Sequence, residues 1–401
     1  MYSVSIDTCR EATYFMKKRL QILALILGLS ILGVGCGETP ANDNNSSGTH
    51  TNATHTENND KLSILRPAAY RDVTGLNLEP GSHISIIGRY DDGSYWEQLE
   101  KGAEQAIDDI NSMLGYKGDD KVQLSYVAPS TVDDIDEQVS ILDEELARYP
   151  LAICISAIDT TACLTQFELA QQDRIPIITF DSGSEYDDVS AHISTDNDKA
   201  SATVAKELVA LMGESGQVAL IVQDSISMTG ILREQGFMNE ITKYPNISVP
   251  FVYHLNDLED MAEQIADEIN LTVEDQKDMV DSEDLSHEDV ILYLMEQHPD
   301  LDAIYTTNLD TTQLVAELLD DENLDDLIFV GFDGGKEQME LLEDDVVDGL
   351  ILQNPYGMGY ATVVAAARTA LGLPNEAYIN SGYTWITKAT METPTIQQYI
   401  Y

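Results

Sequence analysis

The stretch LIFVGFDGG, residues 327–335, decides the fold class of this chain. Its apolar run leads directly into Asp333 and two glycines. The stretch IPIITFDSG, residues 175–183, has the same order, with Asp181 after the apolar run. Short apolar runs bounded by turn residues indicate strands buried on both faces of a parallel sheet. Ligands bind beyond the carboxyl ends of such strands, so each run is predicted to deliver one carboxylate to a ligand-binding edge.

The pattern around these two runs alternates strand and helix in two successive series. The first has predicted strands at residues 84–88, 122–126, 151–155 and 175–180, with helices at 95–110, 139–146 and 164–170. The second has strands at 218–222, 249–253, 303–306 and 327–332, with helices at 200–212, 231–241 and 313–319. Such alternation produces parallel sheets covered by helices on both faces. The 401 residues therefore predict an α/β chain with two doubly wound, Rossmann-like lobes.

The charge of the chain is strongly negative. The sequence has 21 Lys and Arg against 71 Asp and Glu, a formal net charge of −50 with His neutral. A nucleic-acid-binding surface needs basic stripes, so that class of partner is excluded. The same charge disfavours anionic ligands such as sugar phosphates. The acidic stretch 274–289 lacks the spaced ligands and central glycine of a calcium loop, and residues 271–289 are predicted to be a solvated acidic insertion.

The sequence contains no recognised motif for catalysis, for a cofactor or for a metal. The Walker loop, the G-x-S-x-G elbow and the H-E-x-x-H pair are all absent, and Gly-Met-Gly at 357–359 lacks the third glycine of a dinucleotide fingerprint. Cys154 lies in a predicted strand and Cys163 on the expected next helix, so neither a disulfide framework nor a metal site is expected. We therefore expect a protein that is not an enzyme and carries no cofactor.

The N-terminal region has the features of a bacterial secretion signal. MKKR at 16–19 precedes an apolar run at 20–32 and the residues GVGC at 33–36, so Met16 is a candidate for the true start. Cys36 after small residues resembles a lipobox, in which the cysteine is lipidated; an ordinary cleaved signal is the alternative. Residues 37–60 are almost free of apolar side chains and are predicted to be a disordered tether. An N-terminal extension at 61–82 follows.

Seven short motifs occur in the order typical of one known superfamily. They lie at residues 94–103, 175–181, 195–197, 233–237, 306–308, 330–334 and 353–355. In this order the chain resembles the type I periplasmic-binding-protein superfamily, close to its ribose- and galactose-type solute-binding proteins, from about residue 83 to 372. Repressors with this fold carry a DNA-binding helix-turn-helix, where this chain has a secretion signal.

The resemblance implies two lobes joined by three crossovers, near Thr195, Asn354 and Ser381. The N-terminal lobe would comprise residues 83–194 and 354–380, and the C-terminal lobe residues 195–353 and 381–401. A sugar would bind between them. The positions that match sugar-contacting residues of the family are Tyr95, Trp96, Asp181, Arg233, Asn308, Asp333 and Gln353.

The chemistry of the aromatic and acidic candidates suits a sugar. Flat rings such as Tyr95 and Trp96 can pack against the C–H face of a pyranose or furanose, although they could instead cover the core of the lobe. Asp181 and Asp333 could each accept hydrogen bonds from neighbouring hydroxyls, with turn or helix-cap chemistry as the alternative.

The remaining candidates carry hydrogen-bond donors. Arg233 could hold two sugar oxygens or form a surface salt bridge. Asn308 and Gln353 offer both donor and acceptor, and Gln353 beside a crossover could be purely structural. Two positions depart from ribose binders: Ser182 stands where Arg is usual and Gly93 where Asn is common, which leaves the sugar open.

These features together predict a membrane-tethered, extracytoplasmic solute-binding protein. It would be a monomer that closes on a neutral small sugar and delivers it to the permease of an ABC importer. Presentation of the sugar to a sensor kinase or chemoreceptor is the first alternative. An extracellular enzyme acting on glycans is the second, and it would need a carboxylate pair at glycosidase spacing.

Overall fold

The computed structural model describes residues 61–401, except 272, 274–278 and 325. The predicted signal region 1–36 with Cys36, and the predicted tether 37–60, lie outside the described residues. The described chain forms two compact units: residues 255–301 make up one, and residues 61–254 with 302–401 the other. Among the described residues, no helix has both the length and the apolar character needed to cross a membrane.

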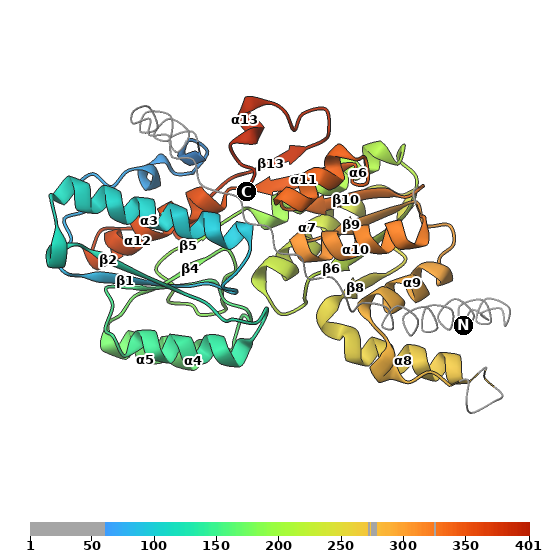
Figure 1. Cartoon of the computed structure of the whole chain (residues 1–401), viewed down its shortest axis with the longest axis horizontal. Coiled ribbons are helices and arrows are strands. Elements are labelled where there is room, and N and C mark those ends of the chain that lie inside the picture. The colour runs from blue at the N-terminus through green and yellow to red at the C-terminus, as the bar shows by residue number, and fades with distance from the viewer. Residues whose placement is uncertain (1–60, 272, 274–278, 325) are drawn as a thin grey trace, which may run out of the picture. The chain divides into compact units, whose positions relative to one another are not determined.

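The larger unit contains two sheets, and the first is parallel throughout. Its strand order is β12-β5-β4-β3-β1-β2, and every pairing in it is parallel. Figure 1 shows α3 and α12 on one face of this sheet and α4 and α5 on the other. The strands are β1 (His83–Ile87), β2 (Gln123–Val127), β3 (Ile153–Ile155), β4 (Ile177–Phe180), β5 (His192–Ser194) and β12 (Tyr378–Asn380). The helices are α3 (Ser94–Leu114), α4 (Ile135–Leu146), α5 (Leu164–Asp173) and α12 (Pro355–Ala370).

The second sheet has the order β13-β11-β10-β9-β6-β7, with β8 also paired to β6. Its strands are β6 (Gly216–Val222), β7 (Ile247–Ser248), β8 (Val252–His254), β9 (Ala303–Thr306), β10 (Ile328–Phe332), β11 (Gly349–Gln353) and β13 (Tyr383–Ile386). Strand β13 is antiparallel to β11, and the other pairings are parallel. The doubly wound α/β prediction is confirmed.

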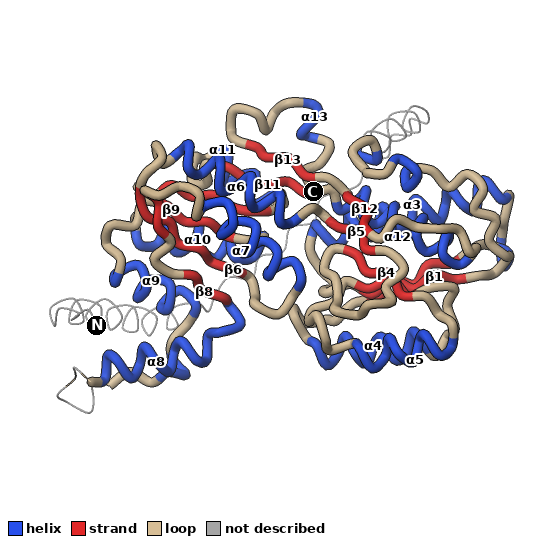
Figure 2. Tube along the Cα trace, turned by 180° about the vertical axis from the view of Figure 1, so that it is seen from behind, coloured by secondary structure: helices blue, strands red, loops and turns tan. Residues whose placement is uncertain are grey.

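Helices cover both faces of the second sheet, as Figure 2 also shows. Helices α6 (Asn197–Leu211) and α7 (Met228–Ile241) share a core with Tyr305 of β9. The neighbouring Thr306 points to the opposite face, because side chains alternate along a strand. There its hydroxyl lies 2.8 Å from that of Thr312 in α10 (Leu309–Glu322). Helix α11 (Lys336–Glu343) packs beside α10.

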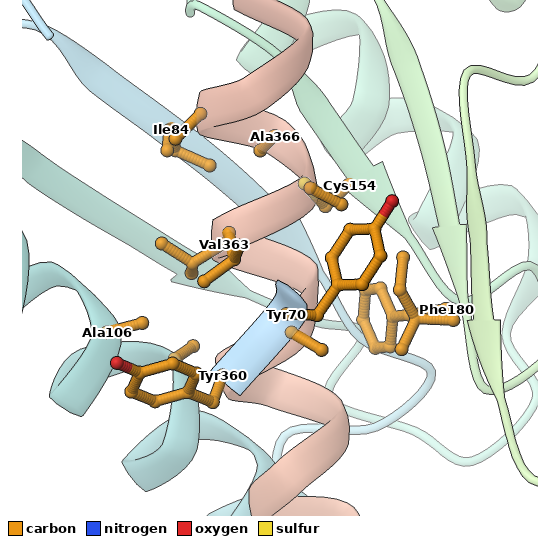
Figure 3. Packing of buried hydrophobic residues seen from close by; sticks show 14 of the residues in the cluster. Tyr70, Ile84, Ala106, Cys154, Phe180, Tyr360, Val363 and Ala366 are labelled. Atoms are coloured by element: carbon orange, nitrogen blue, oxygen red, sulfur yellow. The ribbon is translucent and has the colours of Figure 1, made fainter. Parts of the chain in front are cut away.

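The core of the first sheet is built around α12, which is buried on all sides from Pro355 to Ala367. Figure 3 shows Val363 and Ala366 of this helix packed with Ile84, Cys154 and Phe180. The predicted N-terminal extension takes part in the same core. Its buried apolar residues are Leu62, Leu65, Tyr70, Val73, Leu76 and Leu78. The second described cysteine, Cys163, lies one residue before α5 rather than within it.

Residues 255–301 form a compact unit of helices. They contain η3 (Leu255–Asp257), α8 (Leu258–Asn270), η5 (Ser282–Asp284) and α9 (His287–Gln297). Helix α9 begins inside the stretch that the sequence predicted to be a solvated insertion, because Ser286 and Asp289 form a capping box at its start. The Asn270 side chain holds the backbone of Val280 through hydrogen bonds of 2.9 and 2.8 Å. The described residues 279–289 of the predicted acidic insertion therefore have defined contacts, and η5 and the start of α9 lie within them.

Other elements differ from the predicted pattern for local reasons. The expected strand 249–253 is replaced by β7 and β8 on either side of Pro250, which has no N–H for a sheet ladder. Helix α12 was not predicted because it is apolar all round and lacks an amphipathic period. Strands β5 and β12 were not predicted, because each contains polar residues and neither lies in a continuous apolar run.

The close crossing of α3 and α12 depends on glycine. A Cβ atom at Gly359 would lie 1.9 Å from the Leu99 carbonyl oxygen, and one at Gly102 would lie 2.0 Å from that of Tyr356. The Gly-Met-Gly sequence is thus a helix-packing feature.

We expect Gly359→Ala to lower the free energy of unfolding by about 2 kcal/mol or more, as overpacking does. Urea denaturation measures this. Gly183→Ala is the matched control, because its Cβ would meet its nearest atom at 3.4 Å; equal losses in both variants would contradict the prediction.

Candidate functional site

A cavity in the larger unit is lined by all seven residues that the sequence nominated. They are Tyr95, Trp96, Asp181, Arg233, Asn308, Asp333 and Gln353. They come from the carboxyl ends of β4, β10 and β11, from the starts of α3 and α10, and from α7. The first and second sheets both contribute to the lining. Their contact with a ligand stays a prediction, but the structure brings them to one place.

Three hydrogen bonds hold the carboxylate of Asp333. It directly follows β10 in the left-handed region, with φ of 79°. Its Oδ1 accepts hydrogen bonds from Gln353 Nε2 at 2.6 Å and from the Tyr401 hydroxyl at 2.8 Å. Its Oδ2 accepts one from the Leu309 backbone N–H at 3.0 Å. Burial raises the pKa of Asp333, although Arg233 and the hydrogen bonds from Gln353 and Tyr401 act in the opposite direction.

Asp181 repeats this arrangement at the end of β4. It also has a positive φ, of 53°. Its Oδ1 accepts a hydrogen bond from the Tyr95 hydroxyl at 2.8 Å, and its Oδ2 accepts one from Ser156 Oγ at 3.1 Å. Burial, together with the charge of Asp181, raises the pKa of Tyr95 well above its usual range. Tyr95 therefore remains a neutral donor, and the carboxylate is held as an acceptor that faces the cavity.

The two aromatic residues occupy the first turn of α3. Tyr95 is part of the core of the first sheet and also lines the cavity, so the core position that was its alternative is present, while its contact with a sugar stays a prediction. Trp96 is partly buried, and its ring meets that of Tyr95 edge-on at 5.1 Å. Gly93 precedes this helix with φ of 97°, a conformation that side chains disfavour. That conformation favours glycine at this position.

Arg233 is buried rather than exposed. Only 3% of its surface is accessible, so the alternative of a surface salt bridge is wrong. Its guanidinium donates to Asn197 Oδ1 at 2.8 Å and to the Thr307 carbonyl oxygen at 2.6 Å. The same group lies 3.9 Å from the centre of the Phe332 ring. These contacts present a fixed cation to the cavity.

Asn308 and Gln353 each support the scaffold as well as lining the cavity. Asn308 caps α10, because its Oδ1 accepts a hydrogen bond from the Thr311 backbone N–H at 2.9 Å. Gln353 has both ends of its amide engaged, with Asp333 and with Thr195 Oγ1 at 2.7 Å. The hydrogen bond to Thr195 supports the structural alternative for Gln353.

Arg89 was missed by the sequence analysis although it lines the same cavity. It lies just after β1, and its Nη2 contacts Asp133 at 2.5 Å and Asp224 at 3.3 Å. Burial opposes its charge, but the two carboxylates more than offset this and raise its pKa. The position of Arg89 just after a buried strand could have identified it from the sequence, because the same position after a strand nominated Asp181.

The charged residues that line the cavity are mostly acidic. Its two arginines, Arg89 and Arg233, stand against five aspartates. The aspartates are Asp92, Asp133, Asp181, Asp310 and Asp333. An anionic ligand would meet a repulsive field, whereas a neutral ligand with many hydroxyls would meet both acceptors and donors.

The Arg89 ion pair should matter for stability. Arg89→Ala leaves the buried Asp224 carboxylate without its cation, and we expect a loss of about 3 kcal/mol in the free energy of unfolding. Urea denaturation measures the loss. Lys101→Ala is the control, because the pair between Lys101 and Glu97 is exposed and contributes under about 0.5 kcal/mol. If Arg89→Ala loses no more free energy of unfolding than Lys101→Ala, the ion pair between Arg89 and Asp224 does not stabilise the fold as predicted.

Comparison with known proteins identifies the family. The family model described as periplasmic binding protein domain matches residues 84–374. The ribose import binding protein RbsB of Bacillus subtilis is 22% identical over 58% of this chain and 68% of its own length. RbsB of Salmonella typhimurium is 22% identical over 78% of this chain and 93% of its own length.

Solved structures share the fold. A carbohydrate transporter solute-binding protein from Agrobacterium radiobacter, in complex with D-arabinose, has a TM-score of 0.64 and 24% identity over 80% of this chain and 99% of its own. An ABC transporter solute-binding protein from Agrobacterium vitis with bound D-fucose has a TM-score of 0.65 and 21% identity, over 80% and 100%. Because the family model covers well over half of its length, this chain belongs to the periplasmic binding protein domain family.

Proposed function

We propose that this chain is the extracytoplasmic solute-binding component of an ABC importer and that it binds a neutral small sugar. The observation that carries the proposal is the pair of buried aspartates, Asp181 and Asp333, which face one cavity beside two arginines and two aromatic rings. The similar proteins support the class of ligand, since two relatives are named ribose import binding proteins and two similar solved structures contain D-arabinose and D-fucose.

The recognition chemistry follows from the fixed groups. Asp181 and Asp333 accept hydrogen bonds from sugar hydroxyls, and Arg89 and Arg233 donate hydrogen bonds to sugar oxygens. The ring of Trp96 packs against the C–H face of the sugar. Because these groups are buried, each hydrogen bond contributes to the choice of ligand. A ligand that lacks a hydroxyl leaves a charged side chain without its hydrogen-bond partner, which lowers its affinity.

After two lobes close on the sugar, the protein delivers the sugar to a membrane permease. Residues 83–194 with 354–380 would form one lobe and residues 195–353 with 381–401 the other, with crossovers near Thr195, Asn354 and Ser381. The change of sheet between β5 and α6, between β11 and α12, and between β12 and β13 supports this division. A sugar that contacts both lobes favours the closed state by its differential affinity.

Import is favoured over the two alternatives. The relatives are import proteins and ABC transporter solute-binding proteins, which supports delivery to a permease rather than presentation to a sensor kinase or chemoreceptor. The family is one of binding proteins, so we expect no turnover of glycans. We further propose that Cys36 is lipidated, that residues 37–60 tether a monomeric binding domain to the membrane, and that it works outside the cytoplasm.

The proposed function predicts stabilisation by neutral sugars. A panel of D-ribose, D-arabinose, D-fucose, D-tagatose, D-glucose and D-galactose should contain at least one sugar that raises the melting temperature. We expect a Kd in the micromolar range, or about −8 kcal/mol of binding free energy. D-ribose 5-phosphate is the control, because the acidic cavity should repel it. The proposal fails if no neutral sugar stabilises the protein, or if the phosphate does so better.

Trp96 should contribute directly to affinity. Trp96→Ala removes the partly buried ring from the cavity, and we expect binding of the preferred panel sugar to weaken by about 2 kcal/mol. Isothermal titration calorimetry measures the change. Tyr149→Ala is the control, because that ring is 70% exposed and does not line the cavity. Unchanged affinity in Trp96→Ala would mean that the ring does not stack on the sugar.

A further inference from the structure

Two tyrosines connect the two buried aspartates of the cavity. Tyr95 donates its hydroxyl hydrogen to Asp181, and Tyr401 donates its own to Asp333, both at 2.8 Å. The rings of Tyr95 and Tyr401 meet edge-on, with 5.6 Å between their centres and 75° between their planes. A continuous path therefore runs from Asp181 through both rings to Asp333, and it joins groups at the ends of β4 and β10.

Tyr401 also holds the turn that carries Asp333. Its hydroxyl accepts a hydrogen bond from the Gly334 N–H at 3.2 Å, and its own backbone N–H donates to the Gly334 carbonyl oxygen at 3.2 Å. Asp333 and Gly334 are thus fixed by one residue from outside the second sheet. Tyr401 is not among the residues that line the cavity. Tyr401 contacts the lining of the cavity through Asp333 and Tyr95.

We propose that Tyr401 is a positioning residue for the sugar site: it fixes the carboxylate of Asp333 and couples it, through the ring of Tyr95, to Asp181. This inference rests on the function proposed above. It assigns a role in binding to residues 387–401, which lie beyond the family match at 84–374. Within this segment α13 (Pro394–Gln397) and the buried Ile396 and Tyr399 hold the chain in place.

The hydrogen bonds of Asp333 show what this fixing accomplishes. Each carboxylate oxygen can accept about two hydrogen bonds. Oδ1 already accepts from Gln353 and Tyr401, whereas Oδ2 accepts from Leu309 alone among the described residues. The free acceptor position therefore lies on Oδ2. Loss of the Tyr401 hydroxyl would leave Oδ1 with one donor and allow the carboxylate to rotate.

The proposal predicts a change in the acid–base behaviour of Asp333. A hydrogen bond to the charged carboxylate lowers its pKa, so removal of the Tyr401 hydroxyl should raise it further. A sugar hydroxyl donates to the charged form, so affinity should then begin to fall at a higher pH on acidification. The other titratable groups that act on Asp333 are unchanged by the substitution. They are Arg233 on α7, Asp181 after β4, Tyr95 on α3, Tyr305 on β9 and Asp310 on α10.

The test compares Tyr401→Phe with Tyr356→Phe in the full chain. Both substitutions remove one hydroxyl, but that of Tyr356 is buried without a hydrogen-bond partner among the described residues. Calorimetry would use the sugar from the six-member panel that raises the melting temperature most. We expect Tyr401→Phe to raise its Kd at least tenfold at pH 7.5, and Tyr356→Phe to change it less than twofold. Across a pH series, affinity in Tyr401→Phe should fall off at a higher pH than in the wild type.

A second measurement does not depend on a sugar. Carbon NMR of the Asp333 carboxyl in the ligand-free protein should show its pKa raised in Tyr401→Phe and unchanged in Tyr356→Phe. Replacement of the Tyr401 phenol by a 3-fluorophenol, a stronger donor, should lower that pKa and keeps the ring if Tyr401→Phe does not fold. An Asp333 titration that none of these changes moves would overturn the inference, as would wild-type affinity in Tyr401→Phe. If no panel sugar binds the wild type, the proposed function fails, and the NMR titration still decides the role of Tyr401.

Discussion

Two carboxylates held away from water, Asp181 and Asp333, set the conditions for the rest of the cavity. A buried charge is costly unless hydrogen-bond donors replace the water that it has lost. Asp333 obtains three donors and Asp181 two. These donors come from α3, from Ser156 just after β3, from the end of β11, from the start of α10 and from residue 401. The carboxylates can exist in this form only after all of those elements have come together.

The same requirement explains two buried arginines in so acidic a chain. Most of the negative charge can stay on the solvated surface, where it costs little. Arg89 and Arg233 are instead buried beside the cavity, where carboxylates, amides and a backbone carbonyl accept their hydrogen bonds. Each cation therefore has a fixed position before any ligand arrives. Fixed donors and acceptors lose little entropy when they bind, which is the advantage of a preorganised site.

Several residues serve the scaffold and the cavity at once. Tyr95 belongs to the core of the first sheet, Asn308 caps α10, and Gln353 joins Asp333 to Thr195. If these groups bind a ligand, such sharing would couple binding to folding, because the same side chains also hold the sheets and the start of α10. Substitutions at these residues would then change stability and affinity together.

Local sequence determined much of this protein. The apolar runs, their spacing and the turn residues that follow them identified strands β1 to β4, β6, β9 and β10 and the two strand-ending aspartates, because burial and turn formation leave a pattern within a few neighbouring residues. The order of the short motifs nominated seven residues that all line one cavity.

Only the tertiary structure decided the rest. It placed the start of α9 within the acidic insertion, buried Arg233, placed Arg89 between two carboxylates, and brought Tyr401 to Asp333 across 68 residues of sequence. The sequence pattern does not reveal such partners. A hydrogen bond between distant residues depends on how whole helices and strands pack, and the residues between the two partners show no pattern that predicts the bond.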